Sequence, residues 1–107
     1  MVPVTEKEFQ SAVIAAARAL GWRCAHFRTA LNSRGQWLTP VQADGAGFPD
    51  LILVRGKRII AAELKVARGR VSAEQEAWLE AFRKAGALAP VWRPSDWPEI
   101  ERELGAA

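Results

Sequence analysis

The chain contains few of the side chains that form disulfide frameworks or soft-metal sites. Its 107 residues include one cysteine, Cys24, and one histidine, His26. A lone cysteine excludes an internal disulfide framework and a thiolate zinc site, and it fits a reducing cytoplasm. A lone histidine argues against histidine-rich metal sites and against catalysis with histidine as the general base. Because His26 lies between Ala25 and Phe27, it is more typical of a structural strand residue than of a catalyst.

Long apolar runs are missing as well. None approaches the roughly 18–20 residues needed to cross a bilayer. The charged, amphipathic N-terminus lacks the basic start and apolar block of a signal peptide, so we expect a cytoplasmic protein with no membrane partner. Half of the residues are apolar and a quarter are charged, which is the mixture of an ordinary globular protein. The length suits one domain, residues 1–107, with one modest core.

The apolar periodicity predicts helices and strands separated by one long loop. Thr5 and Glu8 form a capping box at the start of the first helix, and Ser72 opens the second. Two apolar segments joined by a short basic turn predict a β-hairpin. The expected helices cover residues 5–20, 72–85 and 97–104, and the expected strands cover 22–30, 50–54, 58–66 and 88–93. The order is therefore α-β-β-β-α-β-α.

A polar loop over residues 31–47 separates the first strand from the hairpin. Loops of this length tend to be functional or mobile. Trp37 and Leu38 can anchor part of the loop as a short strand, and Trp37 can alternatively stack on an exposed base. The anchoring role is the more common one for a tryptophan in such a loop.

The hairpin carries two acids and a lysine at positions that bring them together. Asp50 opens its first strand, and Glu63 and Lys65 lie two residues apart on the second, so the latter two point to the same face. The two carboxylates and the backbone carbonyl of Leu64 can supply the oxygen ligands that Mg²⁺ prefers. Lys65 can orient an attacking water or stabilise charge on a phosphate. The pattern favours a metal-dependent phosphodiesterase, and surface charges on an ordinary hairpin are the alternative.

Basic residues gather around the same hairpin. The chain has a net charge of +3, and between residues 55 and 70 six basic residues accompany one acid, Glu63. Such a local excess suits a polyanionic partner, although charge alone favours a solvated basic turn. Arg68 and Arg70 are candidates for phosphate contacts because a guanidinium group binds phosphate in a bidentate manner. Solvated loop charges are the alternative. The turn supplies three further candidates for DNA binding, Arg55, Lys57 and Arg58.

The ordered motifs resemble those of the virus-type replication-repair nuclease (VRR-Nuc) domain, which belongs to the PD-(D/E)xK nuclease superfamily. The resemblance covers nearly the whole chain and rests on Gly47-Phe48-Pro49-Asp50, Ala62-Glu63-Leu64-Lys65 and Gly69-Arg70-Val71-Ser72-x-x-Gln75. Two further segments are similar to phage and bacterial stand-alone members, Thr5-Glu6-x-x-Phe9-Gln10 and Val91-Trp92-Arg93-Pro94. The long loop at residues 29–46 departs from the shortest members.

The resemblance implies a restriction-endonuclease-like α/β core, in which a mixed β-sheet is flanked by helices. It also implies a DNA nuclease that depends on Mg²⁺ or Mn²⁺ and acts on branched or flapped DNA. Asp50 and Glu63 match the metal-binding acids, and Lys65 matches the catalytic lysine. Glu6 matches an acid on the first helix that completes the metal site. Gln75 matches a glutamine on the helix after the motif.

Glu6 and Gln75 also have structural explanations. Glu6 lies in the first turn of a helix, where an acid interacts favourably with the helix dipole. Glu8 competes with Glu6 for the catalytic role, but its capping position favours a structural one. Gln75 lies three residues after Ser72, so it can return a hydrogen bond to the Ser72 backbone as part of a capping box. Both roles stay open for Gln75.

We therefore expect a structure-selective DNA nuclease of replication, repair or recombination. Replication or recombination proteins are candidate partners, and a homodimer is compatible with so small a domain. A non-catalytic nucleic-acid-binding module on the same fold is the first alternative, and a structural or interaction protein is the second. The expected catalytic residues are Asp50, Glu63, Lys65 and Gln75, and the expected metal ligands are Glu6, Asp50, Glu63 and the Leu64 carbonyl.

Overall fold

Helices and strands follow one another in the predicted order. The computed structural model describes residues 4–27, 30–31, 33–35, 37–38 and 42–106, with the backbone alone at 30, 31, 37 and 38. The helices of this part of the chain are α1 (Glu6–Ala19), α2 (Ala73–Lys84) and α3 (Trp97–Gly105), and a 3₁₀ turn covers Pro94–Asp96. The strands are β1 (Arg23–His26), β2 (Ala30–Leu31), β3 (Trp37–Leu38), β4 (Leu51–Arg55), β5 (Arg58–Leu64) and β6 (Val91–Trp92).

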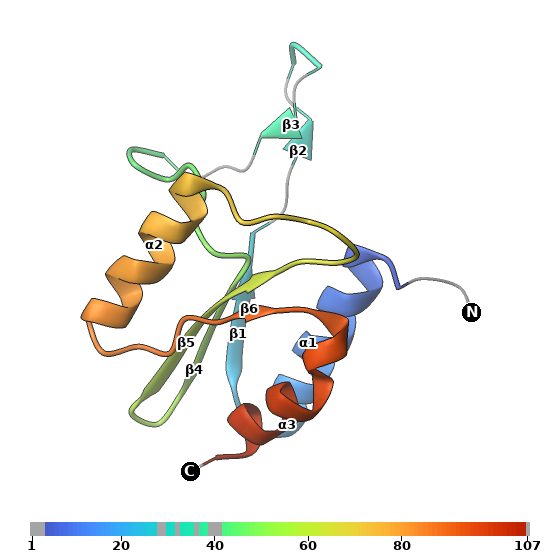
Figure 1. Cartoon of the computed structure of the whole chain (residues 1–107), viewed down its shortest axis with the longest axis vertical. Helices are drawn as coiled ribbons and strands as arrows, with labels where there is room; N and C mark the ends of the chain where they lie inside the picture. The colour runs from blue at the N-terminus through green and yellow to red at the C-terminus, as the bar shows by residue number, and fades with distance from the viewer. Residues whose placement is uncertain (1–3, 28–29, 32, 36, 39–41, 107) are drawn as a thin grey trace.

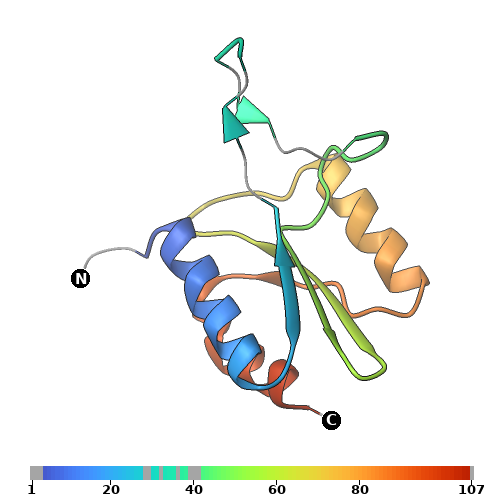
Figure 2. The same ribbon diagram turned by 180° about the vertical axis from the view of Figure 1, so that it is seen from behind.

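A mixed sheet lies between two layers of helix (Figures 1 and 2). Its strand order is β1-β4-β5-β6. The β1–β4 and β4–β5 pairs are antiparallel, and the β5–β6 pair is parallel. Helices α1 and α3 lie on one side of the sheet and α2 lies on the other, as the two views show. This arrangement confirms the predicted α/β class and is consistent with a restriction-endonuclease-like core.

The two faces of the sheet have different cores because successive side chains of a strand point to opposite faces. Leu51, Leu53 and Ile60 belong to the larger core, which also holds Phe9 and Val13 of α1. Members of this core from α3 are Ile100 and Leu104. The smaller core, beneath α2, consists of Ala61, Leu79 and Ala89, with partly buried side chains packed around it.

Both predicted capping boxes are present. The Thr5 hydroxyl accepts a hydrogen bond from Glu8 N–H at 3.1 Å, and the Glu8 carboxylate accepts one from Thr5 N–H at 3.3 Å. The Ser72 hydroxyl accepts a hydrogen bond from Gln75 N–H at 3.1 Å, and Gln75 Oε1 accepts one from Ser72 N–H at 2.8 Å. These bonds satisfy N–H groups that the first turns of α1 and α2 leave without a helical partner.

All four predicted strands of the main sheet differ from their expected bounds, β4 and β5 by only one or two residues at an end and β1 and β6 by more. Strand β1 covers Arg23–His26 and is shorter than the expected 22–30, of which residues 28 and 29 lie outside the described part of the chain. Strand β6 has two residues, and Leu88 joins the sheet through an isolated bridge to Ile60. The proline at position 90 lacks the N–H that a continuous ladder needs.

The loop after β1 contains a small hairpin of its own. The expected short strand at Trp37–Leu38 is confirmed, and it pairs with Ala30–Leu31. This two-stranded sheet stands apart from the main sheet (Figure 1).

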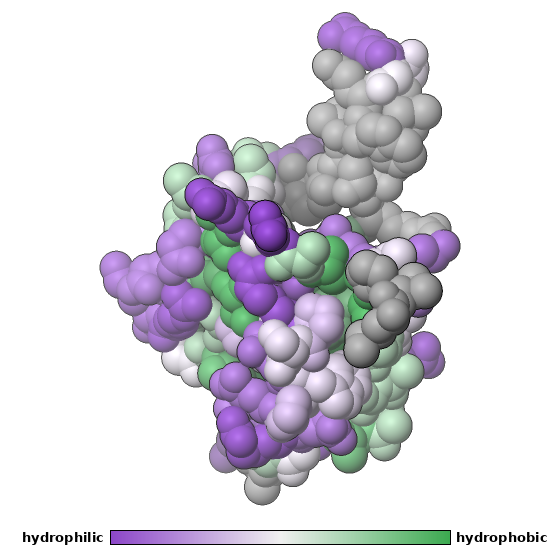
Figure 3. Space-filling view, turned by 45° about the vertical axis from the view of Figure 1, so that its right-hand side comes forward, coloured by the Kyte–Doolittle hydropathy of each residue, from purple (hydrophilic) through white to green (hydrophobic). Residues whose placement is uncertain are grey.

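On the face of the molecule seen in Figure 3, hydrophilic side chains predominate and apolar ones form narrower bands. None of the helices in the described residues has the length and apolar character that a membrane crossing requires.

Candidate active site

The register of the β4–β5 hairpin brings Asp50 and Glu63 opposite each other. Leu51 pairs with Ala62, so the next residue on each strand, away from the turn, faces the other. The N–H of Leu64 donates a hydrogen bond to Asp50 Oδ2 at 2.8 Å. This bond fixes the Asp50 carboxylate at the end of the hairpin where β5 leaves the sheet.

Glu63 is a buried acid with one unpartnered oxygen. Its side chain is 2% exposed. The Oε1 atom accepts a hydrogen bond from Gln75 Nε2 at 3.1 Å and lies 3.8 Å from Lys65 Nζ. The Oε2 atom is buried and has no hydrogen-bond partner. Because an unpartnered buried polar atom costs free energy, Oε2 marks a position for a proton or a cation.

The neighbourhood of Glu63 favours its protonated form. Burial is the main reason that the pKa of Glu63 is raised to about 8, and the adjacent Asp50 carboxyl contributes by accepting a hydrogen bond from the protonated form and by charge repulsion. Glu6 also raises this pKa by repulsion, whereas Lys65 lowers it by attraction. Such a shift in a pair of neighbouring carboxyl groups is a recurrent property of functional sites.

Glu8 has the capping role that its position predicted, whereas the role of Glu6 at the metal site stays a prediction. Glu8 completes the capping box of α1, so its carboxylate is occupied by the backbone. Glu6 is exposed and its charge acts on Glu63. In the described part of the chain, however, no three acids, histidines or cysteines gather closely enough to hold a metal ion. The structure therefore brings Asp50 and Glu63 together but does not bring Glu6 into one ligand group with them.

Gln75 caps α2, as predicted, and also contacts the buried acid, while its predicted catalytic role stays a prediction. Its Oε1 and its backbone N–H belong to the capping box with Ser72. Its Nε2 donates to Glu63 Oε1 at 3.1 Å. One side chain can do both because an amide has an acceptor and a donor. Gln75 thus ties the N-terminus of α2 to the buried acid of β5.

Gly47 sets the distance between the loop before Asp50 and the start of α2. Its φ is +80°, and a Cβ there would lie 2.6 Å from the Glu74 carbonyl carbon and 2.7 Å from Gln75 N. Only glycine permits both this conformation and this approach. The next residue, Phe48, packs edge-on against Trp78, with ring centroids 4.9 Å apart. The close approach to α2 therefore explains why this position of the motif is a glycine, and the sequence pattern alone does not reveal that contact.

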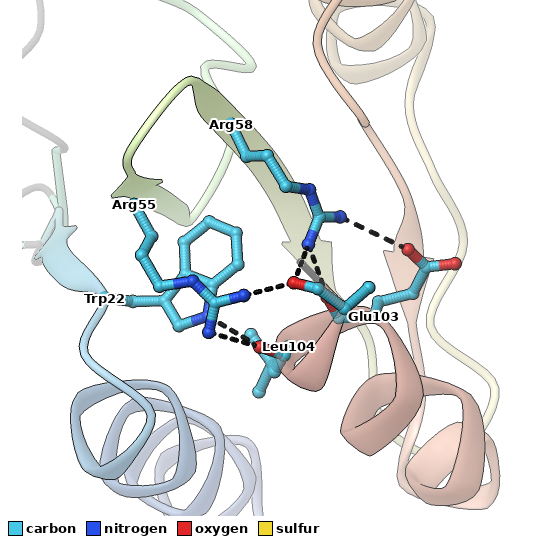
Figure 4. A network of polar contacts seen from close by, with 6 residues as sticks. Trp22, Arg55, Arg58, Glu103 and Leu104 are labelled. Carbon is cyan, nitrogen blue, oxygen red and sulfur yellow. Dashed lines mark hydrogen bonds and ion pairs between the residues drawn. The ribbon is translucent and has the colours of Figure 1, made fainter.

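The basic turn lies at the far end of the hairpin and makes structural contacts (Figure 4). Arg55 is five residues from Asp50, about 17 Å along an extended strand. It donates to the Leu20 and Leu104 carbonyls at 3.0 Å each and also to the Ala106 carbonyl. Its guanidinium carbon lies 4.7 Å from the centre of a Trp22 ring.

Arg58 makes similar contacts beside it. It donates to the Glu103 carbonyl at 2.9 Å and forms an ion pair of 3.6 Å with the Glu103 carboxylate. Cations near the last carbonyls of a helix are stabilising. These contacts give Arg55 and Arg58 a structural role at the end of α3, and their predicted contact with DNA stays a prediction. Lys57, between them, is exposed.

The arginines after β5 follow Lys65 closely in the sequence. Arg68 and Arg70 are exposed and follow Lys65 by three and five residues. Their predicted contact with phosphate stays a prediction, as does the use of the Leu64 carbonyl as a ligand. The sequence placed Arg93 in a motif segment but gave it no role, and in the structure its guanidinium contacts the loop that carries these arginines.

The carboxylate oxygens at the open end of the hairpin, opposite its turn, fit a hard divalent cation. Mg²⁺ and similar cations prefer oxygen ligands, and Mg²⁺ is usually held by one or two carboxylates with the remaining positions left to water and substrate phosphate. Asp50 and Glu63 supply two carboxylates, and Glu63 Oε2 has no other partner. A cation there would relieve the repulsion that raises the pKa of Glu63.

The mixed four-stranded sheet flanked by helices defines a small α/β domain that is consistent with a restriction-endonuclease-like core. The VRR-NUC domain matches residues 16–95, which is more than half of the chain. The chain therefore belongs to the VRR-NUC domain family, a family of nucleases. Asp50, Glu63, Lys65 and Gln75 lie inside the matched residues and Glu6 lies outside them. A comparison with curated proteins found no match.

Proposed function

We propose that this protein is a deoxyribonuclease that hydrolyses phosphodiester bonds with Mg²⁺ or Mn²⁺. The observation that carries the proposal is the buried Glu63 carboxylate, which has an unpartnered oxygen, lies opposite Asp50 and is 3.8 Å from Lys65 Nζ. Membership of the VRR-NUC family supports the reaction class and DNA as the substrate.

The residues have distinct roles in this proposal. Asp50 and Glu63, with the Leu64 carbonyl, would hold the cation, and Glu6, which stands apart from them, would act from α1 through a metal-bound water. A bound divalent cation polarises a phosphate and lowers the pKa of a coordinated water.

Lys65 and Gln75 act around these acids. Lys65 places a positive charge where negative charge develops on the phosphate and orients the attacking water. Gln75 holds Glu63 Oε1 by a hydrogen bond, so that Oε2 stays available.

The finer assignments rest on the family resemblance and on charge. We propose selectivity for branched or flapped DNA, phosphate contacts by Arg68 and Arg70, and action of residues 1–107 as one nuclease domain. A homodimer would let so small a domain grip a branched substrate. A cytoplasmic setting and partners from replication, repair or recombination complete the proposal.

A cleavage panel tests the reaction. Single-stranded, duplex, nicked, flapped and four-way-junction DNA would be incubated with the wild-type protein in Mg²⁺ or Mn²⁺, beside Asp50→Asn and Lys65→Ala. We expect the wild-type protein to cut at least one branched form. Each substitution should lower the cleavage rate by about 10²–10³-fold, because each removes a charge that acts in the transition state.

Two results would overturn the assignment. If DNA were cleaved as fast by Asp50→Asn and Lys65→Ala as by the wild-type protein, the cleavage would not depend on the proposed active site. DNA binding without cleavage by the wild-type protein, in either metal, would instead support the non-catalytic binding module.

A further inference from the structure

The loop that follows β5 is a tight turn in a constrained conformation. Gly69 N–H donates to the Val66 carbonyl at 2.9 Å, which closes the turn. Ala67, within the turn, has a φ of +50°, a conformation that costs free energy for a residue other than glycine. A turn of this kind persists only where surrounding contacts hold it.

The turn packs directly on the side chain of Lys65. A Cβ built on Gly69 would lie 3.4 Å from Lys65 Cδ and 3.7 Å from Lys65 Cβ. Gly69 therefore lies against the apolar stem of the lysine, whose side chain is 17% exposed. Lys65 carries a long stem with considerable rotamer freedom, so a backbone packed against that stem limits where the ammonium group can go.

Arg93 holds the turn from the neighbouring strand. The parallel β5–β6 pair aligns Leu64 with Trp92, and Lys65 N–H donates to the Trp92 carbonyl at 3.0 Å. Arg93 thus follows Trp92 directly beside Lys65. Its guanidinium Nη2 donates to the Gly69 carbonyl at 2.8 Å.

The backbone of Arg93 is fixed as well. Its N–H donates to Asp96 Oδ2 at 2.9 Å, at the start of the 3₁₀ turn before α3. The contacts form a chain in which α3 and its preceding turn hold Arg93, Arg93 holds Gly69, and Gly69 packs on Lys65.

We infer that Arg93 is a positioning residue for Lys65, acting through the Gly69 turn. This inference rests on the proposed function for its catalytic consequence, but the contact itself can be tested without activity. Arg93 need not touch DNA in this account. Its effect is to keep the ammonium group of Lys65 next to Glu63, where the two lie 3.8 Å apart.

Hydrogen exchange gives the test that is independent of activity. In Arg93→Gln, amides of the turn at residues 66–70 should exchange about five- to tenfold faster, the change expected for the loss of one exposed hydrogen bond of ordinary net strength. Arg83→Gln is the matched control, because Arg83 also donates to a backbone carbonyl, that of Ala89, at 2.7 Å. The control should leave exchange at 66–70 unchanged. Unchanged exchange in Arg93→Gln would overturn the inference.

Steady-state cleavage gives the second test. Arg93→Gln should lower kcat by about ten- to hundredfold, because misplacement of a catalytic group by about 1 Å has effects of this size, while KM stays within about twofold. Arg93→Lys keeps a cation that can reach the turn, so it should restore part of kcat. A loss confined to KM, with a smaller salt dependence of binding, would overturn the inference and identify Arg93 as a phosphate contact.

Gly69→Ala provides a second variant that leaves Arg93 in place. The added Cβ would lie 3.2 Å from the Val66 carbonyl oxygen and 3.4 Å from Lys65 Cδ, so it should lower kcat with little change in KM. An unaltered kcat would contradict the positioning role. If the wild-type protein cuts no DNA in the panel, the proposed function fails, and the exchange experiment still decides whether Arg93 holds the turn.

Discussion

At the turn of the β4–β5 hairpin, Arg55 and Arg58 donate to backbone carbonyls around the end of α3 and lie over the ring of Trp22. At the open end of the same hairpin, Glu63 is buried with one oxygen that has no partner. Both ends are charged and both are close to the core. At the turn, the two guanidinium groups have hydrogen-bond partners within the fold. At the open end, Glu63 Oε2 has none.

This difference separates a structural role from a functional one. Charged groups whose donors meet carbonyls in good geometry stabilise a fold. A buried carboxylate with an unpartnered oxygen lowers stability, so its presence points to a group that binds there. Charge composition alone would place the functional region around the whole basic hairpin, whereas the contacts favour its open end.

The largest expected effect is the loss of cleavage in Glu63→Gln. The amide keeps the shape of the side chain but removes the negative charge, so the cleavage rate should fall by about 10²–10³-fold. Circular dichroism should show that the variant is folded. A variant that cuts DNA at the wild-type rate would show that the open end is not the site of the reaction.

The second prediction concerns the pH dependence of stability without metal. The pKa of Glu63 is about 8 in the folded protein and 4.5 as its ordinary value. Between these values the folded state holds a proton that the unfolded state has lost, so stability is full below the lower value and falls as pH rises through the window. The free energy of unfolding should fall between pH 5 and pH 8 by an amount on the order of 3 kcal/mol.

Urea unfolding of wild type and Glu63→Gln across this range measures that effect. Glutamine does not titrate, so the difference between the two proteins isolates the contribution of Glu63. Parallel curves, with the same decrease in both proteins, would mean that the pKa of Glu63 is not raised.

The third prediction concerns the turn end. Arg55→Ala removes several hydrogen bonds to carbonyls and a contact with Trp22, so the free energy of unfolding should fall by about 2 kcal/mol. Cleavage per folded molecule should stay within about twofold of wild type. Lys57→Ala is the control, because Lys57 is exposed on the same turn. If Arg55→Ala lost most of its activity while its stability stayed at the wild-type level, the turn would be part of the functional site.

The smallest effect is expected on DNA binding, from single substitutions of exposed basic residues after β5 and in the β4–β5 turn. Arg68→Ala and Arg70→Ala should each weaken DNA binding and reduce the slope of log affinity against log salt by about 0.7–0.9, the change for one phosphate contact. Lys57→Ala should leave the slope unchanged. Binding to fluorescent duplex and flapped DNA without divalent metal measures both. Equal effects from all three substitutions would contradict the distinction between the two ends.

Local features of the fold were predictable from the sequence. The capping boxes at Thr5 and Ser72 depend on residues three apart, and the pairing of Asp50 with Glu63 follows from a short turn between two apolar segments. The candidate acids and the lysine could be predicted for the same reason, since their proximity is set by one hairpin.

Features that depend on distant contacts were not predictable. The partners of Arg55 are carbonyls up to 51 residues away, so the basic turn could not be assigned to α3 from its own composition. The burial of Glu63 beneath α2 and the close approach of Gly47 to Glu74 also depend on how α2 packs. The pattern identified Gly47 as part of a motif, but the reason for a glycine there is a backbone contact with a helix that begins 26 residues later.

Binding of Mn²⁺ to the wild-type protein tests the central claim most directly. Calorimetric titrations at pH 7, in two buffers with different ionisation enthalpies, measure both affinity and proton release. Because the pKa of Glu63 is about 8, cation binding at Asp50 and Glu63 should release about one proton per Mn²⁺. Glu63→Gln should bind more weakly and release none. The absence of Mn²⁺ binding by wild type, or the same affinity and proton release in Glu63→Gln, would contradict the account.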